Sequence, residues 1–207
     1  MNYSYFRIVS MNMKQKAIFL DRDGTINDDS KPIFIKGIGN TSGYVHHIDQ
    51  WVLLPEVTKA LQQLSKTDYK LIIVTNQSSV ARGICTEIQI TKLHDQVRKD
   101  FKKNNIRIDG IYICPHLENG TVKQFAINCN CRKPKPGMLL QASADHNISL
   151  EESYMIGDKD SDILCGQAAG CKTILIQGFH KTKSSPSWKA ENLLQASAII
   201  MRKTKWH

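Results

Sequence analysis

One short stretch near the start of the chain constrains the fold more than any other. From Ala17 to Thr25, four apolar residues are followed at once by Asp-Arg-Asp-Gly-Thr. This pattern favours a parallel strand buried on both faces, with polar residues beginning where its carboxyl end meets solvent. Because side chains alternate along an extended segment, Asp21 and Asp23 can face the same way and hold a cation. The competing interpretation is a simple turn, since Asp and Gly are common turn formers.

Apolar runs that suit strands alternate with amphipathic patterns that suit helices along most of the chain. The predicted strands after the first are 70–77, 110–113, 153–158 and 172–177. The predicted helices are 55–65, 86–103, one beginning at 136, 161–169 and 187–201. Residues 26–51 lack sustained helical periodicity and are predicted to form a long loop. The alternation predicts an α/β fold with a doubly wound parallel sheet.

Length and charge limit what the chain can be. Its 207 residues suit one domain over 17–201, with a poorly ordered lead-in over 1–16 and a basic tail over 202–207. The net charge of +9 indicates an anionic partner, either nucleic acid or a phosphorylated metabolite, or simply a solvated surface. No apolar run approaches the roughly 18 residues that span a bilayer, and no secretory signal pattern begins the chain. We therefore expect a cytoplasmic protein with no membrane partner.

Polar side chains follow three of the predicted strands. Asp21 and Asp23 end the first, Thr75 and Asn76 end the second, and Asp158 ends a later one. A doubly wound sheet can bring such ends together at one edge. Carboxylate oxygens suit Mg²⁺, which retains several waters in protein sites. Carboxylates, a hydroxyl and a cation together suit phosphoryl transfer, in which positioning and charge neutralisation provide most of the catalysis.

A cysteine-containing segment lies between the third predicted strand and Arg132. Without an export signal, the six cysteines of the chain are better explained as free thiols or metal ligands than as disulfides. The candidate ligands of a structural zinc ion are Cys114, His116, Cys129 and Cys131. One residue separates the members of each pair, whereas the common zinc pattern has two to four. Reduced, partly buried thiols are therefore the alternative, and the remaining cysteines, Cys85, Cys165 and Cys171, are assigned to that class.

Four motifs in chain order resemble those of the haloacid-dehalogenase-superfamily phosphatases. They are Asp21-x-Asp23-Gly24-Thr25, Thr75-Asn76-Gln77, Arg132-Lys133-Pro134 and Gly157-Asp158-Lys159-x-x-Asp162. The resemblance covers about residues 17–177. It implies a Rossmann-like fold, here with a small zinc-pinned loop over 114–131 and no large cap domain, and a Mg²⁺-dependent phosphatase.

The same resemblance implies a chemical role for each motif. Asp21 would attack phosphorus, while Asp23 would protonate the leaving alcohol and later deprotonate water. Thr75 and Lys133 would stabilise the phosphoryl oxygens. The implied Mg²⁺ ligands are Asp21, the backbone carbonyl of Asp23, and Asp158. Asp162 would either buttress this site or be a solvated or capping residue.

A wider set of motifs resembles the D-glycero-D-manno-heptose-1,7-bisphosphate 7-phosphatases. They are residues 21–27, 43–46, 75–78, 81–83, 114–116, 131–138 and 157–159. This resemblance implies removal of the C7 phosphate from a small anionic sugar bisphosphate, on the route to nucleotide-activated heptose for lipopolysaccharide core or surface glycans. The implied substrate contacts are Asn76, Gln77, Ser78, Arg132 and Lys159, together with Asp28 or Asp29, Gly43 and Tyr44.

Residues 30–42 look like an insertion into that pattern, within a segment, 28–50, that is expected to govern specificity. The nearest alternative is a histidinol-phosphate phosphatase, whose related scaffold also carries a Cys-x-His and Cys-x-Cys zinc loop. The twelve-residue spacer and Pro136-Gly137-Met138 favour the sugar phosphatase. A zinc-containing nucleic-acid-binding module is disfavoured because the cysteine segment is poor in Lys and Arg. We expect a monomer that does not bind nucleic acid.

Overall fold

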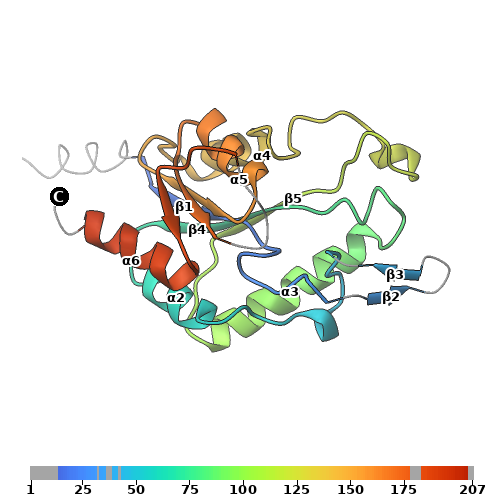
Figure 1. The fold of residues 1–207 in the computed structure, drawn as a ribbon, viewed down its shortest axis with the longest axis horizontal. Helices are drawn as coiled ribbons and strands as arrows, with labels where there is room; N and C mark the ends of the chain where they lie inside the picture. Colours follow the sequence, from blue (N-terminus) through green and yellow to red (C-terminus); the bar gives the residue numbers. More distant parts are fainter. Residues whose placement is uncertain (1–13, 32, 36–38, 42, 178–182, 205–207) are drawn as a thin grey trace, which may run out of the picture.

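Six parallel strands form the central sheet of the protein, seen here in a computed structural model (Figure 1). The structure describes residues 14–31, 33–35, 39–41, 43–177 and 183–204. The sheet order is β5 (Gly110–Cys114), β4 (Lys70–Asn76), β1 (Ala17–Leu20), β6 (Tyr154–Gly157), β7 (Lys172–Ile176) and β8 (Trp188–Ala190). The chain thus starts in the middle of the sheet and extends it first to one side and then to the other. Ligands bind at such reversal points, outside the carboxyl ends of the strands.

Helices cover both faces of this sheet, as Figure 1 shows. One face carries α2 (Val57–Leu64), α3 (Glu87–Lys103) and α6 (Leu193–Thr204), and the other carries α4 (Gly137–His146) and α5 (Asp160–Ala168). In β1, Ile18 and Leu20 pack toward the first layer, whereas Ala17 and Phe19 pack toward the second. All four side chains are fully buried. The predicted α/β fold with a doubly wound sheet is confirmed, and the residues that the structure describes form no large cap domain.

The segment predicted to be a long loop contains regular structure. An antiparallel hairpin of β2 (Ile33–Ile35) and β3 (Gly39–Thr41) is followed by a 3₁₀ helix, η1 (Ile48–Gln50). Figure 1 shows the hairpin at the edge of the molecule, away from the central sheet. Its strands are three residues each, too short for the alternation of apolar and polar residues to reveal them. A second 3₁₀ helix, η2 (Lys123–Phe125), lies in the cysteine-containing loop.

The predicted terminal helix over 187–201 is wrong at both ends. Trp188–Ala190 form the edge strand β8, which pairs with Ile174–Ile176 of β7. The helix α6 begins only at Leu193, where the Asn192 side chain accepts a hydrogen bond from the Gln195 N–H (2.9 Å). It then continues to Thr204, so part of the predicted basic tail is helical. A three-residue strand is too short to display a period of its own, which explains the error.

Backbone hydrogen bonds to the rest of the domain also begin earlier than Ala17. Gln15 donates its N–H to the carbonyl of Asn147 (2.8 Å) and accepts from the N–H of Ser149 (2.8 Å). The predicted lead-in therefore does not extend to residue 16, while its residues 1–13 lie outside the described part of the chain.

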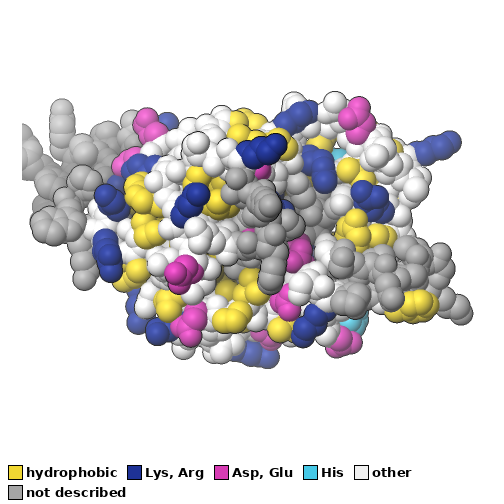
Figure 2. All heavy atoms as spheres, in the orientation of Figure 1, with side chains coloured by type: hydrophobic (Ala, Val, Ile, Leu, Met, Phe, Trp, Pro, Cys, Tyr) yellow, Lys and Arg dark blue, Asp and Glu magenta, His cyan; other side chains and the backbone are white. Residues whose placement is uncertain are grey.

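Charged side chains are mixed over the face drawn in Figure 2. Lysines and arginines are scattered there, with acidic side chains between them. Proteins that bind nucleic acids usually gather basic residues into a patch or stripe, and the described residues on this face form no such stripe. Among the described helices, none is both long enough and apolar enough to cross a membrane.

Core packing can be tested with two leucines on different helices. Leu61 of α2 is 0% exposed, whereas Leu140 of α4 is 50% exposed. Leu61→Ala should lower the free energy of unfolding by about 2–5 kcal/mol, because it removes buried methyl groups and leaves a cavity. Leu140→Ala should lower it by less than about 1 kcal/mol. Urea denaturation measures both values, and equal losses would contradict this packing.

Candidate active site

The site forms where β1 ends. The Asp21 N–H donates to the carbonyl of Ile156 in β6 (2.9 Å), so the backbone continues the sheet by one residue. Asp21 and Asp23 are both buried. Gly24 follows with a φ of +88°, and a Cβ there would lie 2.4 Å from Oδ2 of Asp158. Only glycine fits this position, because both the backbone conformation and the close approach exclude a side chain.

Carboxylates converge at this edge of the sheet. Ligand oxygens of Asp21, Asp158 and Asp162 all lie within 4.8 Å of one another. Burial raises the pKa of Asp21 to about 8, and burial likewise raises the pKa of Asp158. The two acids are therefore costly to ionise without a further cation. Hard oxygen ligands that converge in this way fit Mg²⁺.

Lys133 supplies a fixed positive charge to the cluster. Its Nζ donates to Asp21 Oδ1 (2.5 Å) and to the carbonyl of Val74 (2.8 Å), and it lies 2.7 Å from Asp162 Oδ1. Burial opposes the charged form, but the carboxylates of Asp162 and Asp21 outweigh it and raise the pKa of Lys133 above its usual range. Asn76 fastens the lysine backbone, donating to its carbonyl (3.1 Å) and accepting from its N–H (3.1 Å).

Asp162 is neither solvated nor only a cap. It is buried, and besides pairing with Lys133 it accepts the N–H of Lys159 (3.1 Å) at the start of α5. Asp162 therefore both pairs with Lys133 of the cluster and caps the start of α5.

The second carboxylate, Asp23, is held by a fork of donors. The side chain of Arg22 is 0% exposed and donates to Asp23 Oδ1 through Nε (3.0 Å) and Nη2 (2.8 Å). Asn27 and Gln77 add donors at 3.0 Å and 2.8 Å. Burial alone would raise the pKa of Asp23, but the Arg22 charge and these hydrogen bonds lower it overall. The carboxylate is ionised near neutral pH.

Sequence reasoning did not single out Arg22 or Asn27. An arginine between two aspartates usually lies in solvent with its charge satisfied by water, and no spacing rule distinguishes a buried one. Only the structure shows that Arg22 turns inward.

The tip of β4 supplies a hydroxyl beside the carboxylates. Thr75 is buried, and its Oγ1 accepts a hydrogen bond from Nε2 of Gln77 (2.8 Å), which leaves its own proton to donate. Gln77 is buried too, with its amide directed to Asp23 and Thr75. Ser78 follows in the turn after the strand. The substrate contacts predicted for Asn76, Gln77 and Ser78 stay predictions.

Lys159 faces the other side of the cluster. Its Nζ lies 3.3 Å from the backbone carbonyl of Asp23, 3.7 Å from Asp158 Oδ2 and 3.8 Å from Asp29 Oδ2. The structure therefore brings Asp29 and Lys159 to the same site. A cavity of about 320 Å³ opens beside them, with walls that include Gly24, Asp158, Asp28 and Asp29.

The insertion leaves its two ends together. The Gly43 N–H donates to the carbonyl of Asp29 (2.9 Å), and Gly43 adopts a φ of +80° at this junction. Tyr44 follows and is partly buried. The predicted contact residues on either side of the insertion thus remain neighbours, even though residues 32, 36–38 and 42 lie outside the described structure.

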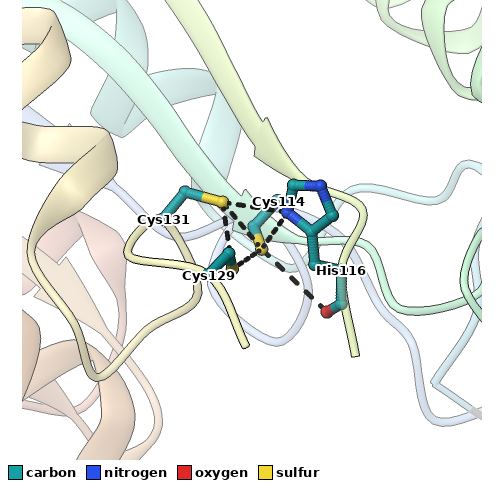
Figure 3. Close-up of side chains that lie close together, drawn as sticks. All are labelled: Cys114, His116, Cys129 and Cys131. Atoms are coloured by element: carbon teal, nitrogen blue, oxygen red, sulfur yellow. Dashed lines mark hydrogen bonds between the residues drawn. The ribbon is translucent and has the colours of Figure 1, made fainter. Parts of the chain in front are cut away.

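The four predicted zinc ligands also meet (Figure 3). The three sulfur atoms are separated by 3.2–3.5 Å, and His116 Nδ1 lies 3.2 Å from Cys131 Sγ and 3.8 Å from Cys114 Sγ. Tetrahedral zinc with Zn–S bonds of about 2.3 Å places ligand sulfurs about 3.8 Å apart. The cluster is thus close to the size of a zinc site, and its cysteines form no disulfide. The donor set fits zinc.

Arg132 directly follows the last of these cysteines. Its Nη1 donates to the carbonyl of His116 (3.1 Å), which ties the arginine to the cysteine-containing loop. It lines an open cavity of about 460 Å³ together with Lys133 and Lys135. Arg132 thus lines an opening at the surface, whereas the ammonium group of its neighbour Lys133 lies in the carboxylate cluster.

Known proteins share this sequence and fold. A family model described as HAD-hydrolase-like matches residues 130–196. A Pasteurella multocida protein named D-glycero-beta-D-manno-heptose-1,7-bisphosphate 7-phosphatase is 44% identical over 92% of this chain and 97% of its own length. A protein of the same name from Escherichia coli K12 is 38% identical over 91% of this chain and 95% of its own.

A solved structure agrees with these relatives. The D,D-heptose 1,7-bisphosphate phosphatase from B. bronchiseptica, complexed with magnesium and phosphate, is 26% identical and superposes with a TM-score of 0.74, covering 91% of this chain and 99% of that one. The chain is therefore a phosphoric monoester hydrolase of the HAD-like group, and it belongs to the D-glycero-β-D-manno-heptose-1,7-bisphosphate 7-phosphatase family.

Proposed function

We propose that the protein removes the C7 phosphate of D-glycero-β-D-manno-heptose 1,7-bisphosphate through a phosphoaspartyl intermediate on Asp21. The buried Asp21 carboxylate, held 2.5 Å from Lys133 Nζ with a second carboxylate two residues further on, is the observation that carries this proposal. The names of the relatives, which specify a heptose bisphosphate with the β configuration, support this choice of substrate. A carboxylate nucleophile divides one difficult displacement into two easier ones.

In the first step, Asp21 attacks phosphorus and the bond to the C7 oxygen breaks. Asp23 gives a proton to that oxygen, so the sugar leaves as a neutral alcohol. Arg22 favours the ionised form of Asp23 in the free protein, but a phosphate dianion nearby raises the pKa of this carboxyl again. In the second step, Asp23 takes a proton from water, which attacks the phosphoaspartyl group and releases phosphate. Thr75 and Lys133 bind the phosphoryl oxygens throughout.

The carboxylates of Asp21 and Asp158, with the backbone carbonyl of Asp23, would hold Mg²⁺. When bound, this ion neutralises charge on the phosphoryl oxygens. Support comes from the convergence of the acids and from the raised pKa of both side chains, since a divalent cation relieves the cost of ionising them in a buried site. The solved relative that contains magnesium and phosphate points the same way.

We also propose that Cys114, His116, Cys129 and Cys131 hold a structural Zn²⁺. All four ligand positions are supplied by protein, as in closed structural sites. The ion would fix the loop whose last ligand is adjacent in sequence to Arg132 and Lys133. The ion would therefore orient the side chains of Arg132 and Lys133 by fixing the backbone that precedes them.

The rest of the substrate would lie between the base of the insertion on one side and Arg132 on the other. Asp29, Gly43 and Tyr44 meet at the base of the insertion, where carboxylate and backbone groups can bind sugar hydroxyls. Arg132 offers a planar cation that suits a phosphate. We place the reaction in the cytoplasmic route to nucleotide-activated heptose for lipopolysaccharide core or surface glycans. The chain would act there as a monomer on this small substrate, without nucleic acid or membrane.

Substrate choice can be tested by turnover of three compounds. The β anomer of the heptose bisphosphate should be hydrolysed with a kcat/KM at least about tenfold above that of the α anomer and of histidinol phosphate. Phosphorus NMR should show loss of the C7 phosphomonoester while the anomeric phosphate remains. A preference for histidinol phosphate would refute the proposed substrate.

The covalent mechanism predicts the behaviour of Asp21→Asn. Turnover should fall at least about 1,000-fold, because an amide cannot attack phosphorus. The fold should persist, since the amide is neutral and nearly isosteric. Phosphate release and circular dichroism measure the two effects. Asp145→Asn, an exposed change on α4, should leave turnover unchanged. Substantial turnover by the Asp21 variant would exclude covalent catalysis by this residue.

The zinc proposal predicts about one zinc ion per chain by mass spectrometry of the purified protein. Cys129→Ser should lose the metal and lower the melting temperature, and it should reduce turnover by up to about 100-fold through misplacement of Lys133. Cys171→Ser alters a buried thiol outside the cluster and should keep the zinc. A wild-type protein without zinc, or a Cys129 variant that retains it, contradicts this site.

A further inference from the structure

Arg22 contacts four different parts of the protein. Its Nε and Nη2 face Asp23, and Nη2 also donates to the carbonyl of Val45 (2.7 Å) and to Gln77 Oε1 (3.2 Å). The remaining nitrogen, Nη1, lies 3.0 Å from Nε2 of His94. The guanidinium is thus held between the ends of β1 and β4, the segment after the hairpin, and α3.

His94 lies on the buried face of α3. The helix begins after Thr86, whose side chain caps it, and its predicted apolar face packs against the sheet. His94 is 6% exposed, and the charged groups that act on it are Arg22, Asp23 and Arg98. Burial, and next the charge of Arg22, lower the pKa of His94 to about 3. The ring is therefore neutral at ordinary pH, and its Nε2 accepts the hydrogen bond that Nη1 donates.

A guanidinium is planar and rigid, so a hydrogen bond that restrains one nitrogen also restricts the directions in which the other two can point. We propose that His94 is a positioning residue: by accepting the Arg22 Nη1 hydrogen bond, it orients the Arg22 fork and thereby the carboxylate of Asp23. The inference rests on the proposed function, in which Asp23 is the acid and base. His94 would act through Arg22, which lies between it and Asp23.

Without His94, a donor of Arg22 would be left buried and unpaired. Such a group costs the full penalty of desolvation, so the guanidinium should turn toward another acceptor. Asp23 would then lose the alignment needed to protonate the departing oxygen. Acid catalysis matters most when the leaving alcohol is a poor leaving group, as a sugar hydroxyl is, and least when it is an acidic phenol.

Two substrates therefore separate positioning from general damage. We compare kcat/KM, which reports the steps up to departure of the alcohol, for the heptose bisphosphate and for p-nitrophenyl phosphate. His94→Leu should lower the value for the heptose bisphosphate by about 10- to 100-fold and that for p-nitrophenyl phosphate by less than about threefold. His94→Gln, whose amide oxygen can replace Nε2 as acceptor, should restore most of the loss.

Two further variants serve as controls. Val97 lies on the same buried face of α3 but its apolar side chain cannot hydrogen-bond to Arg22, so Val97→Ala should destabilise the protein while affecting both substrates equally. His94→Asn keeps a polar amide, but its shorter side chain falls short of Nη1. It should therefore reproduce the selective loss of His94→Leu, even where the leucine variant folds poorly.

The result that overturns the inference is an equal effect of His94→Leu or His94→Asn on the two substrates, or a failure of folded His94→Gln to recover activity. Asp23→Asn separates this failure from that of the proposed function. If Asp23→Asn shows the selective loss and the His94 variants do not, only the positioning role of His94 is refuted. If Asp23→Asn also affects the two substrates equally, the assignment of Asp23 as the acid fails, and the inference about His94 fails with it.

Discussion

The site depends on one buried lysine placed between two aspartates. Lys133 is removed from water, which is costly unless carboxylates and carbonyls replace the lost hydration, and Asp21, Asp162 and Val74 do so at 2.5–2.8 Å. The arrangement joins the loop after β5 to the ends of β1 and β4 and to α5. Its carboxylates and cation also suit phosphoryl transfer, so the same side chains can hold these elements together and take part in the reaction.

The surroundings of the two carboxylates of the first motif shift their pKa values in opposite directions. Burial dominates at Asp21 and raises its pKa, whereas the charge and donors of Arg22 outweigh burial at Asp23 and lower its pKa. Two aspartates separated by a single residue thus acquire different acidities. A pair of acids separated in this way is typical of sites that divide nucleophilic attack from proton transfer.

Five of the six strands of the central sheet, the four motifs and the cysteine cluster could be predicted because each rests on a local pattern: an apolar run ending in polar residues, or metal-binding residue types at short spacing. Arg22 and His94 could not be, because their importance comes from contacts between β1 and α3, more than 70 residues apart. The strand β8 was missed because three residues at a sheet edge show no period. Local signals locate the reactive groups, while long-range packing decides how they are oriented.

The hydrogen bond between Gly43 and Asp29 joins the two ends of the segment that contains the hairpin, close to the site. Because it closes the base, the length and composition of the chain between these residues can change while the two ends keep their positions. A loop closed in this way can lengthen at small entropic cost. The insertion is thus a place where the protein can acquire new surface without altering the positions of its reactive groups.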